Sequence, residues 1–255
     1  MRSLVNLERY FESGSGELPI VFSSPHGGYK RPRKIKDIVN GAKFADRATY
    51  LISRYLIDRL LKEKIEIFYI FSKIHRNKID FNRPPNTNNA LNQDANSKKE
   101  AKQIHSYYHQ QIQSFVSKSI EKYGICFFID FHGFTKPFEE YPDIIFGNLF
   151  GNTLNIRKRL DDDNLDGEGN FYYWGYSELL TSLKKHFKTD DGLGITDYNL
   201  AYSGGYITYQ FYERKFVNAI QLEISLEIRK NLNSLKKFSN EFIASINEVT
   251  NRLNY

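Results

Sequence analysis

Apolar residues along this chain occur in blocks of two lengths. The short blocks are continuous runs rich in β-branched and aromatic residues, which are typical of core strands. The long blocks have apolar residues at helical spacing. We therefore expect strands at four runs: 18–24, 65–71, 125–131 and 218–224. We expect helices at four longer segments: about 42–63, 97–122, 176–188 and 232–253.

This order of strands and helices predicts an α/β layer architecture with a largely parallel central sheet, in a single domain that spans 1–255. The asparagine-rich stretch 82–100, with its Pro-Pro pair, is typical of a long surface loop. In α/β sheets, ligand-binding groups collect beyond the C-terminal ends of the strands. Polar residues at the ends of the four runs are therefore candidates for a site.

Three of the four apolar runs lead into polar side chains that are costly to bury without a partner. The first run leads into His26, the third into Asp130 and His132, and the fourth carries Gln221 and Glu223. Residues two apart in a strand share a face, so Gln221 and Glu223 point the same way. Each group alone could be a satisfied polar residue of the core. All three at one edge of the sheet favour a site that holds a metal or a substrate dipole.

The second run leads into the segment 73–85, which contains Arg76 and Arg83 as well as further polar residues. The forked guanidinium of arginine suits carboxylates and oxyanions. Two arginines seven residues apart could form a surface ion-pair network, or they could clamp an anionic substrate. The residues alone leave both interpretations open.

The composition narrows the class of protein. The net charge is +6, and the dense basic run at 30–36, KRPRKIK, is either a solvated loop or a phosphate-facing patch, so nucleic acid is an unfavoured but open partner. Cys126 is the single cysteine, which excludes an internal disulfide and a cysteine-based metal cage, and its apolar setting predicts a packed thiol. The sequence has no apolar stretch of ~18 residues and no apolar N-terminal segment. We therefore expect a cytoplasmic protein without a membrane partner.

Four motifs resemble the N-formylglutamate amidohydrolase family, in the family's order. They are SSPHGG at 23–28, HRNKIDFNR at 75–83, IDFHG at 129–133 and SGGYITYQFYERKFVNAIQLEIS at 203–225. That family is similar in turn to the zinc carboxypeptidase and aspartoacylase group. The resemblance covers roughly residues 18–230 and implies a three-layer α/β/α fold with a mixed, largely parallel sheet. It also implies a hydrolase with one zinc ion per chain that cleaves the amide bond of a small anionic N-acyl amino acid.

The resemblance also implies a role for each matching residue. His26 and His132 match the two histidine ligands of the zinc ion. Glu223 matches the catalytic glutamate, which would act as the general base, and Arg76 matches the arginine that polarises the scissile carbonyl. The residues that match the substrate-binding positions are Asn82 and Arg83, with Gly205 and Tyr206 as further candidates on a close-approaching or mobile segment.

The third zinc ligand is the position where this sequence departs from the carboxypeptidase pattern. A glutamate follows three residues after the first histidine in that group, and here Tyr29 occupies the place. The N-formylglutamate amidohydrolase pattern has an aspartate at the start of the next helix, which assigns Asp46 as the ligand. Asp130 and Asp143 are the alternatives, and Asp46 could instead be a surface residue favoured by the helix dipole.

Two further motifs are weaker candidates for metal binding. His105 and His109 lie four apart on one face of a predicted helix, but Ser106 stands where a metalloprotease would have its glutamate. The segment 162–173 begins like a calcium loop, but its twelfth position is Tyr173 rather than a bidentate glutamate. We interpret the first as packing or helix surface and the second as an acidic turn.

The sequence thus predicts a zinc amidohydrolase, with two alternatives. One is a zinc metallopeptidase of carboxypeptidase type, and the other is a non-catalytic relative that binds a ligand or nucleic acid. The acyl group, the amino-acid half of the substrate and the oligomeric state stay open.

Overall fold

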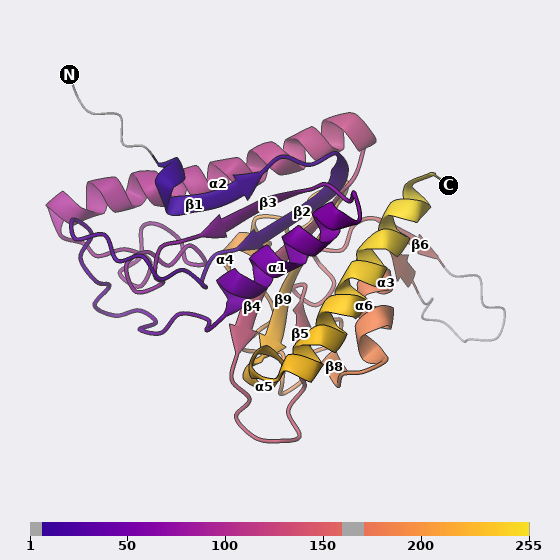
Figure 1. The fold of residues 1–255 in the computed structure, drawn as a ribbon. Coiled ribbons are helices and arrows are strands. Elements are labelled where there is room, and N and C mark those ends of the chain that lie inside the picture. The colour runs from indigo at the N-terminus through magenta and orange to yellow at the C-terminus, as the bar shows by residue number, and fades with distance from the viewer. Residues whose placement is uncertain (1–6, 160–170, 255) are drawn as a thin grey trace.

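The fold is that of a computed structural model, which describes residues 7–159 and 171–254 (Figure 1). A seven-stranded sheet forms its centre, with the strand order β1-β3-β2-β4-β9-β5-β8. The strands of this sheet are β1 (Phe11–Gly14), β2 (Leu18–Ser24), β3 (Ile67–Ser72), β4 (Cys126–Phe134), β5 (Ile144–Gly147), β8 (Thr189–Asp190) and β9 (Val217–Ser225). Strands β6 (Arg157–Arg159) and β7 (Phe171–Tyr173) form a separate antiparallel pair.

The four predicted strands are β2, β3, β4 and β9, which lie side by side and run parallel. Strand β1 pairs antiparallel with β3, and β5 pairs antiparallel with β9, so the sheet is mixed and largely parallel as expected. The sequence analysis missed β1, β5 and β8. Each has four residues or fewer, too short for an apolar run to stand out.

Helices cover both faces of the sheet, which gives the expected three layers (Figure 1). Helix α2 (Ala95–Tyr123) packs on one face through residues such as Tyr108 and Phe115. The other face packs against α1 (Thr49–Lys62), α3 (Tyr176–Lys184) and α6 (Leu232–Asn251), with Phe238 and Phe242 of α6 fully buried. The short helices are α4 (Tyr206–Tyr209), α5 (Leu226–Lys230), η1 (Glu8–Tyr10) and η2 (Arg252–Asn254). In the described parts of the chain, no helix has the length and apolar character needed to cross a membrane.

The ends of the helices follow local rules, with one instructive departure. The side chain of Asp94 caps the start of α2, and Gly124 ends it in the left-handed conformation at φ 76°. Helix α1 begins at Thr49 rather than near residue 42. The chain before it forms bends and a turn instead of a helix: the amide of Asp46 donates to the carbonyl of His26 at 3.1 Å, and Ala48 is in the left-handed conformation at φ 69°.

The position of the site follows from a change of residue type along the strands. On the face that α2 covers, the first halves of β2, β4 and β9 are apolar, and the second halves carry Ser23, Asp130, His132, Gln221 and Glu223. Asp130 is paired in register with Ser23 and Gln221, and His132 with Glu223. The C-terminal ends of the three central strands therefore bring these side chains together, as the sheet rule predicts.

Candidate active site

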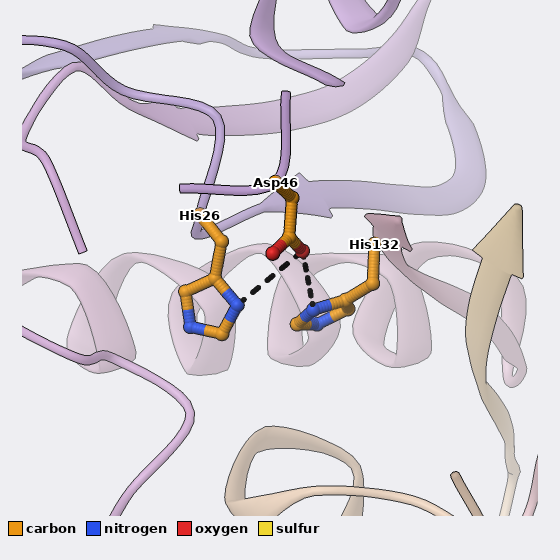
Figure 2. A group of neighbouring side chains, drawn as sticks. All are labelled: His26, Asp46 and His132. Atoms are coloured by element: carbon orange, nitrogen blue, oxygen red, sulfur yellow. Dashed lines mark ion pairs between the residues drawn. The ribbon is translucent and has the colours of Figure 1, made fainter. Parts of the chain in front are cut away.

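Two histidines and an aspartate converge at the C-terminal ends of β2 and β4. Asp46 lies between His26 and His132 (Figure 2), and one ligand atom from each residue lies within 4.8 Å of the other two. The Oδ2 atom of Asp46 is 3.6 Å from Nδ1 of His26 and 3.5 Å from Nδ1 of His132. All three side chains are buried.

The hydrogen bonds of the two imidazoles fit a metal ion in the space between them. Nε2 of His26 is 2.8 Å from Oδ1 of Asp80, and Nε2 of His132 is 2.7 Å from Oδ2 of Asp130. A neutral imidazole that donates through Nε2 presents the lone pair of Nδ1 toward Asp46, and Nδ1 of His26 is buried without a hydrogen-bond partner. Two nitrogen lone pairs, each on an imidazole backed by an outer carboxylate, together with the carboxylate of Asp46 form a donor set that zinc prefers.

The electrostatics of the cluster favour a positive charge at the same place. Burial lowers the pKa of His132, but the charge of Asp130 and its hydrogen bond outweigh this effect and raise the pKa well above the ordinary value. Burial raises the pKa of Asp46, but the nearby imidazoles of His132 and His26 outweigh burial and hold the pKa well below the ordinary value. Asp46, Asp80 and Asp130 thus place negative charge beside the two imidazoles, and a bound cation would help to neutralise it.

The geometry separates Asp46 from the two alternative ligands. Asp46 is fixed by its backbone bond to His26 and by the amide of Gly133, which donates to its Oδ2 at 3.1 Å. Asp130 supports His132 from behind and accepts a hydrogen bond from Ser23. Asp143 forms an ion pair with Lys136 and does not join the cluster. Tyr29, which occupies the place of the glutamate ligand in the carboxypeptidase pattern, is 65% exposed. Asp46 supplies the carboxylate of the cluster instead.

Glu223 lies beside His132 on the neighbouring strand and has one oxygen without a partner. Its Oε1 accepts a hydrogen bond from Nε2 of Gln221 at 2.9 Å, and its buried Oε2 has none among the described residues. Burial raises the pKa of Glu223 to about 7, the charge of Asp46 adds to this effect, and His132 opposes it. A carboxylate with a free oxygen and a pKa near neutrality suits proton transfer.

A chain of amides fixes the residues next to Glu223. The amide of Ile207 donates to Oδ1 of Asn82 at 2.9 Å, and Nδ2 of Asn82 donates to Oε1 of Gln221 at 3.0 Å. The same oxygen of Gln221 accepts from the amide of Gly205 at 2.8 Å. A β-carbon at Gly205 would lie 2.1 Å from Nδ2 of Asn82, so only glycine allows this approach. Asn82 therefore joins α4 to β9.

A polar pocket of about 240 Å³ opens beside this cluster. Arg76 lies at its wall, where Nε donates to Asp80 at 2.9 Å and Nη1 is 3.4 Å from Asp46. Arg83 has an exposed side chain that also lines the pocket. The full lining is Asp46, Arg76, Asn82, Arg83, His132, Gly133, Phe134, Ala201, Tyr202, Gly204, Gly205, Gln221 and Glu223.

The structure therefore gathers eight of the nine predicted site residues around one space, or within the cluster of His26, Asp46 and His132 beside it. Tyr206 is the exception, because its ring packs 5.3 Å from that of His109 and does not line the pocket. The sequence reasoning missed Tyr202, which lines the pocket four residues earlier and which no motif distinguished. It also gave no role to Asp80, although its position four residues after Arg76 was a usable signal.

His105 and His109 of α2 hold the loop that carries Asn82. Nε2 of His105 is 3.0 Å from the carbonyl of Arg83, and Nε2 of His109 is 3.0 Å from the carbonyl of Phe81. Burial lowers the pKa of His105 to about 4 and that of His109 to about 3, so both are neutral donors at physiological pH. This agrees with packing rather than with metal binding.

Three remaining sequence interpretations concern residues away from the cluster. Cys126 is buried, and burial raises the pKa of its thiol to about 12. The basic run 30–36 is a loop with Ile35 buried and its cations on the surface. Residues 162–170 of the acidic segment 162–173 lie outside the described residues.

The two glycines that follow His26, Gly27 and Gly28, lie where other parts of the backbone come close. A β-carbon at Gly27 would lie 2.2 Å from the amide of Tyr50, and one at Gly28 would lie 2.4 Å from the carbonyl of Ile74. Both positions therefore allow close backbone approach, the first to α1 and the second to the chain after β3.

Comparisons with known proteins identify the fold and the family of this chain. No curated protein matches the chain. The crystal structure of N-formylglutamate amidohydrolase from Ralstonia eutropha JMP134 is similar, with a TM-score of 0.66, 16% identity, and coverage of 96% of this chain and 98% of that one. A gene product from Agrobacterium tumefaciens is also similar, with a TM-score of 0.65, 12% identity, and coverage of 95% and 94%. At these identities the two likenesses establish the fold.

The family is established by a separate comparison. The model of the N-formylglutamate amidohydrolase family matches residues 18–228, which include every predicted site residue. This chain therefore belongs to the N-formylglutamate amidohydrolase family.

Proposed function

We propose that this protein is a zinc-dependent amidohydrolase that cleaves a small, anionic N-acyl amino acid similar to N-formylglutamate. The observation that carries the proposal is the convergence of His26, Asp46 and His132, with both Nδ1 atoms about 3.5 Å from one carboxylate oxygen. Membership of the family supports an amide substrate. The outer carboxylates Asp80 and Asp130 support a metal because they fix the tautomer that a ligand needs.

Glu223 would move the proton in the hydrolysis. When bound, a zinc ion supplies Lewis acidity and stabilises negative charge that develops on oxygen. The water oxygen bonds to the acyl carbon and the carbon–nitrogen bond breaks, while Glu223 takes a proton from the water and gives it to the leaving nitrogen. Its raised pKa, caused first by burial, keeps it able to do both near neutral pH.

Arg76 and Arg83 would have different roles: one would stabilise charge on the acyl oxygen, and the other would bind the carboxylate of the substrate. Two contacts from Arg76 to Asp80 and Asp46 fix its guanidinium at the pocket wall, and its Nη2 has no partner among the described residues. That group could donate a hydrogen bond to the acyl oxygen. One such donor lowers the activation free energy of the reaction by about 3–4 kcal/mol. Arg83, exposed at the mouth, could bind the carboxylate of the amino-acid half with Asn82 beside it.

The size of the pocket favours a small substrate over a peptide. Its volume of about 240 Å³ is less than the roughly 300–1,000 Å³ of pockets that hold drug-sized ligands. The carboxypeptidase alternative would need space for a residue on each side of the scissile bond. No described feature favours the non-catalytic alternative, because the proton-transfer candidate and the three ligand candidates are all present.

Elemental analysis followed by substrate assays tests the proposal. We expect one equivalent of zinc per chain, release of formate from N-formylglutamate, loss of activity after chelation and its recovery with zinc. Release of a C-terminal amino acid from dipeptides, without formate release, would support the metallopeptidase instead. Full activity in protein shown to contain no metal would refute the zinc site.

A further inference from the structure

Arg229 is a buried arginine behind the active site, with 7% of its surface exposed. It belongs to α5, which begins directly after β9. Its side chain points back across the ends of the strands. No ion pair within 4.0 Å joins it to a described carboxylate, and its hydrogen bonds go to backbone carbonyls, while the charges of Asp46 and Glu223 act on it from farther away. A buried guanidinium without a directly paired anion is costly, so a compensating role is expected.

The carbonyls that Arg229 contacts lie next to the functional residues. Nη1 donates to the carbonyl of Arg47, the residue after Asp46. Nη2 donates at 2.6 Å to the carbonyl of Phe134, two residues after His132. Nε lies 3.3 Å from the carbonyls of both Ile224 and Ser225, which directly follow Glu223. One rigid fork therefore joins three segments that are distant in the sequence.

The guanidinium of Arg229 also packs closely on Gly133, where any other residue would have a β-carbon in the way. A β-carbon at Gly133 would lie 2.5 Å from Cζ of Arg229, so the guanidinium packs against the backbone of this glycine. The amide of the same glycine donates to Oδ2 of Asp46 at 3.1 Å. Oδ2 is also the oxygen that both Nδ1 atoms approach. The guanidinium thus supports the peptide that orients the carboxylate ligand.

We propose that Arg229 is a positioning residue, which holds Asp46, His132 and Glu223 at working separations through the carbonyls beside them. The metal part of this inference rests on the proposed function, but the geometric part does not. Lysine at 229 would keep the charge, but a single ammonium group cannot reach carbonyls on three segments in the planar geometry of a guanidinium. The shape of the group, rather than its charge, is therefore what the site requires.

The test compares Arg229→Lys with wild type in two measurements. In metal-free protein, the amide of Gly133 should exchange with solvent at least 10-fold faster, because its acceptor on Asp46 is no longer held. In titrations with zinc and a competing chelator, the dissociation constant should rise roughly 10- to 100-fold, as for other residues behind metal ligands. Arg214→Lys is the matched control, since this half-buried arginine lies just before the opposite end of β9.

The outcomes separate a positioning role from a structural one. If Arg229→Lys lowers only the melting temperature, and both the exchange rate and the zinc dissociation constant stay within 2-fold of wild type below that temperature, the proposal is overturned. Arg229→Gln, a smaller neutral change, gives the same comparison if the lysine variant does not fold. If wild type binds no zinc, the proposed function fails, and the exchange of Gly133 still decides the role of Arg229.

Discussion

Replacing Glu223 with glutamine should make the metal-free protein more stable and the enzyme inactive. Glutamine has the shape of glutamate, and its carbonyl oxygen can accept the hydrogen bond that Gln221 now donates to Oε1. The substitution therefore removes the titrating proton and the negative charge and little else. Without a base at this place, turnover should fall about 10²- to 10⁴-fold.

The size of the stabilisation follows from the pKa of Glu223. Burial is the main cause that raises this pKa from an ordinary 4.5 to about 7 in the folded protein. A difference of one in pKa corresponds to 1.36 kcal/mol, so holding the ionised form in the fold costs about 3 kcal/mol. The folded state binds the proton more tightly than the unfolded state. The contribution of Glu223 is therefore favourable below pH 4.5 and is lost as the pH rises through 7.

Urea unfolding in the presence of a chelator, at pH values from 4.5 to 8.5, measures this effect. The difference between Glu223→Gln and wild type should grow from near zero at pH 4.5 to about 3 kcal/mol in favour of the variant above pH 7. Glu227→Gln, an exposed change four residues later, is the control and should show no such growth. A constant difference over this pH range would refute the reasoning about burial, even if the variant were inactive.

Three further predictions concern the residues around this carboxylate. His132→Ala should bind less than a tenth of an equivalent of zinc by elemental analysis, because one of three ligands is removed, and stoichiometric zinc would contradict the ligand set. Gly205→Ala should raise KM or lower kcat at least 10-fold in steady-state assays, since its β-carbon would lie 2.1 Å from Nδ2 of Asn82; unchanged kinetics would show that Asn82 does not depend on this approach. Burial lowers the pKa of His105 to about 4 and that of His109 to about 3, so stability should fall as the pH drops from 6.5 toward 3. In urea unfolding, His109→Gln should lose less stability than wild type over that range, and an equal loss would argue against a neutral His109.

The central sheet could be predicted because its four parallel strands are buried on both faces, so each is a continuous apolar run. The other three strands of the sheet could not, because β8 has two residues and β1 and β5 have four each. The start of α1 was also wrong, by about seven residues. The apolar spacing continues before Thr49, and only the tertiary contact of Asp46 with His26 shows that this segment is not helical.

The site could be predicted where strand ends carry polar residues, as His26, His132 and Glu223 do. Asp46 could be assigned only through the family resemblance, because an aspartate ahead of a helix is common and its partners are distant in sequence. Tyr202 and Arg229 could not be found in this way. One lies in a loop without a motif, and the other acts through backbone carbonyls, which any sequence supplies.

The amide chain from α4 to β9 decides which oxygen of Glu223, the proposed general base, would carry the transferred proton. Two backbone N–H groups, of Ile207 and Gly205, set the polarity of the Asn82 and Gln221 side chains, so Gln221 must direct its NH₂ group at Glu223. Oε1 of Glu223 is therefore locked as an acceptor. Protonation is confined to Oε2, which has no partner among the described residues. The carboxyl group would therefore take up and release the proton at the same atom, without rotating between the two halves of the reaction.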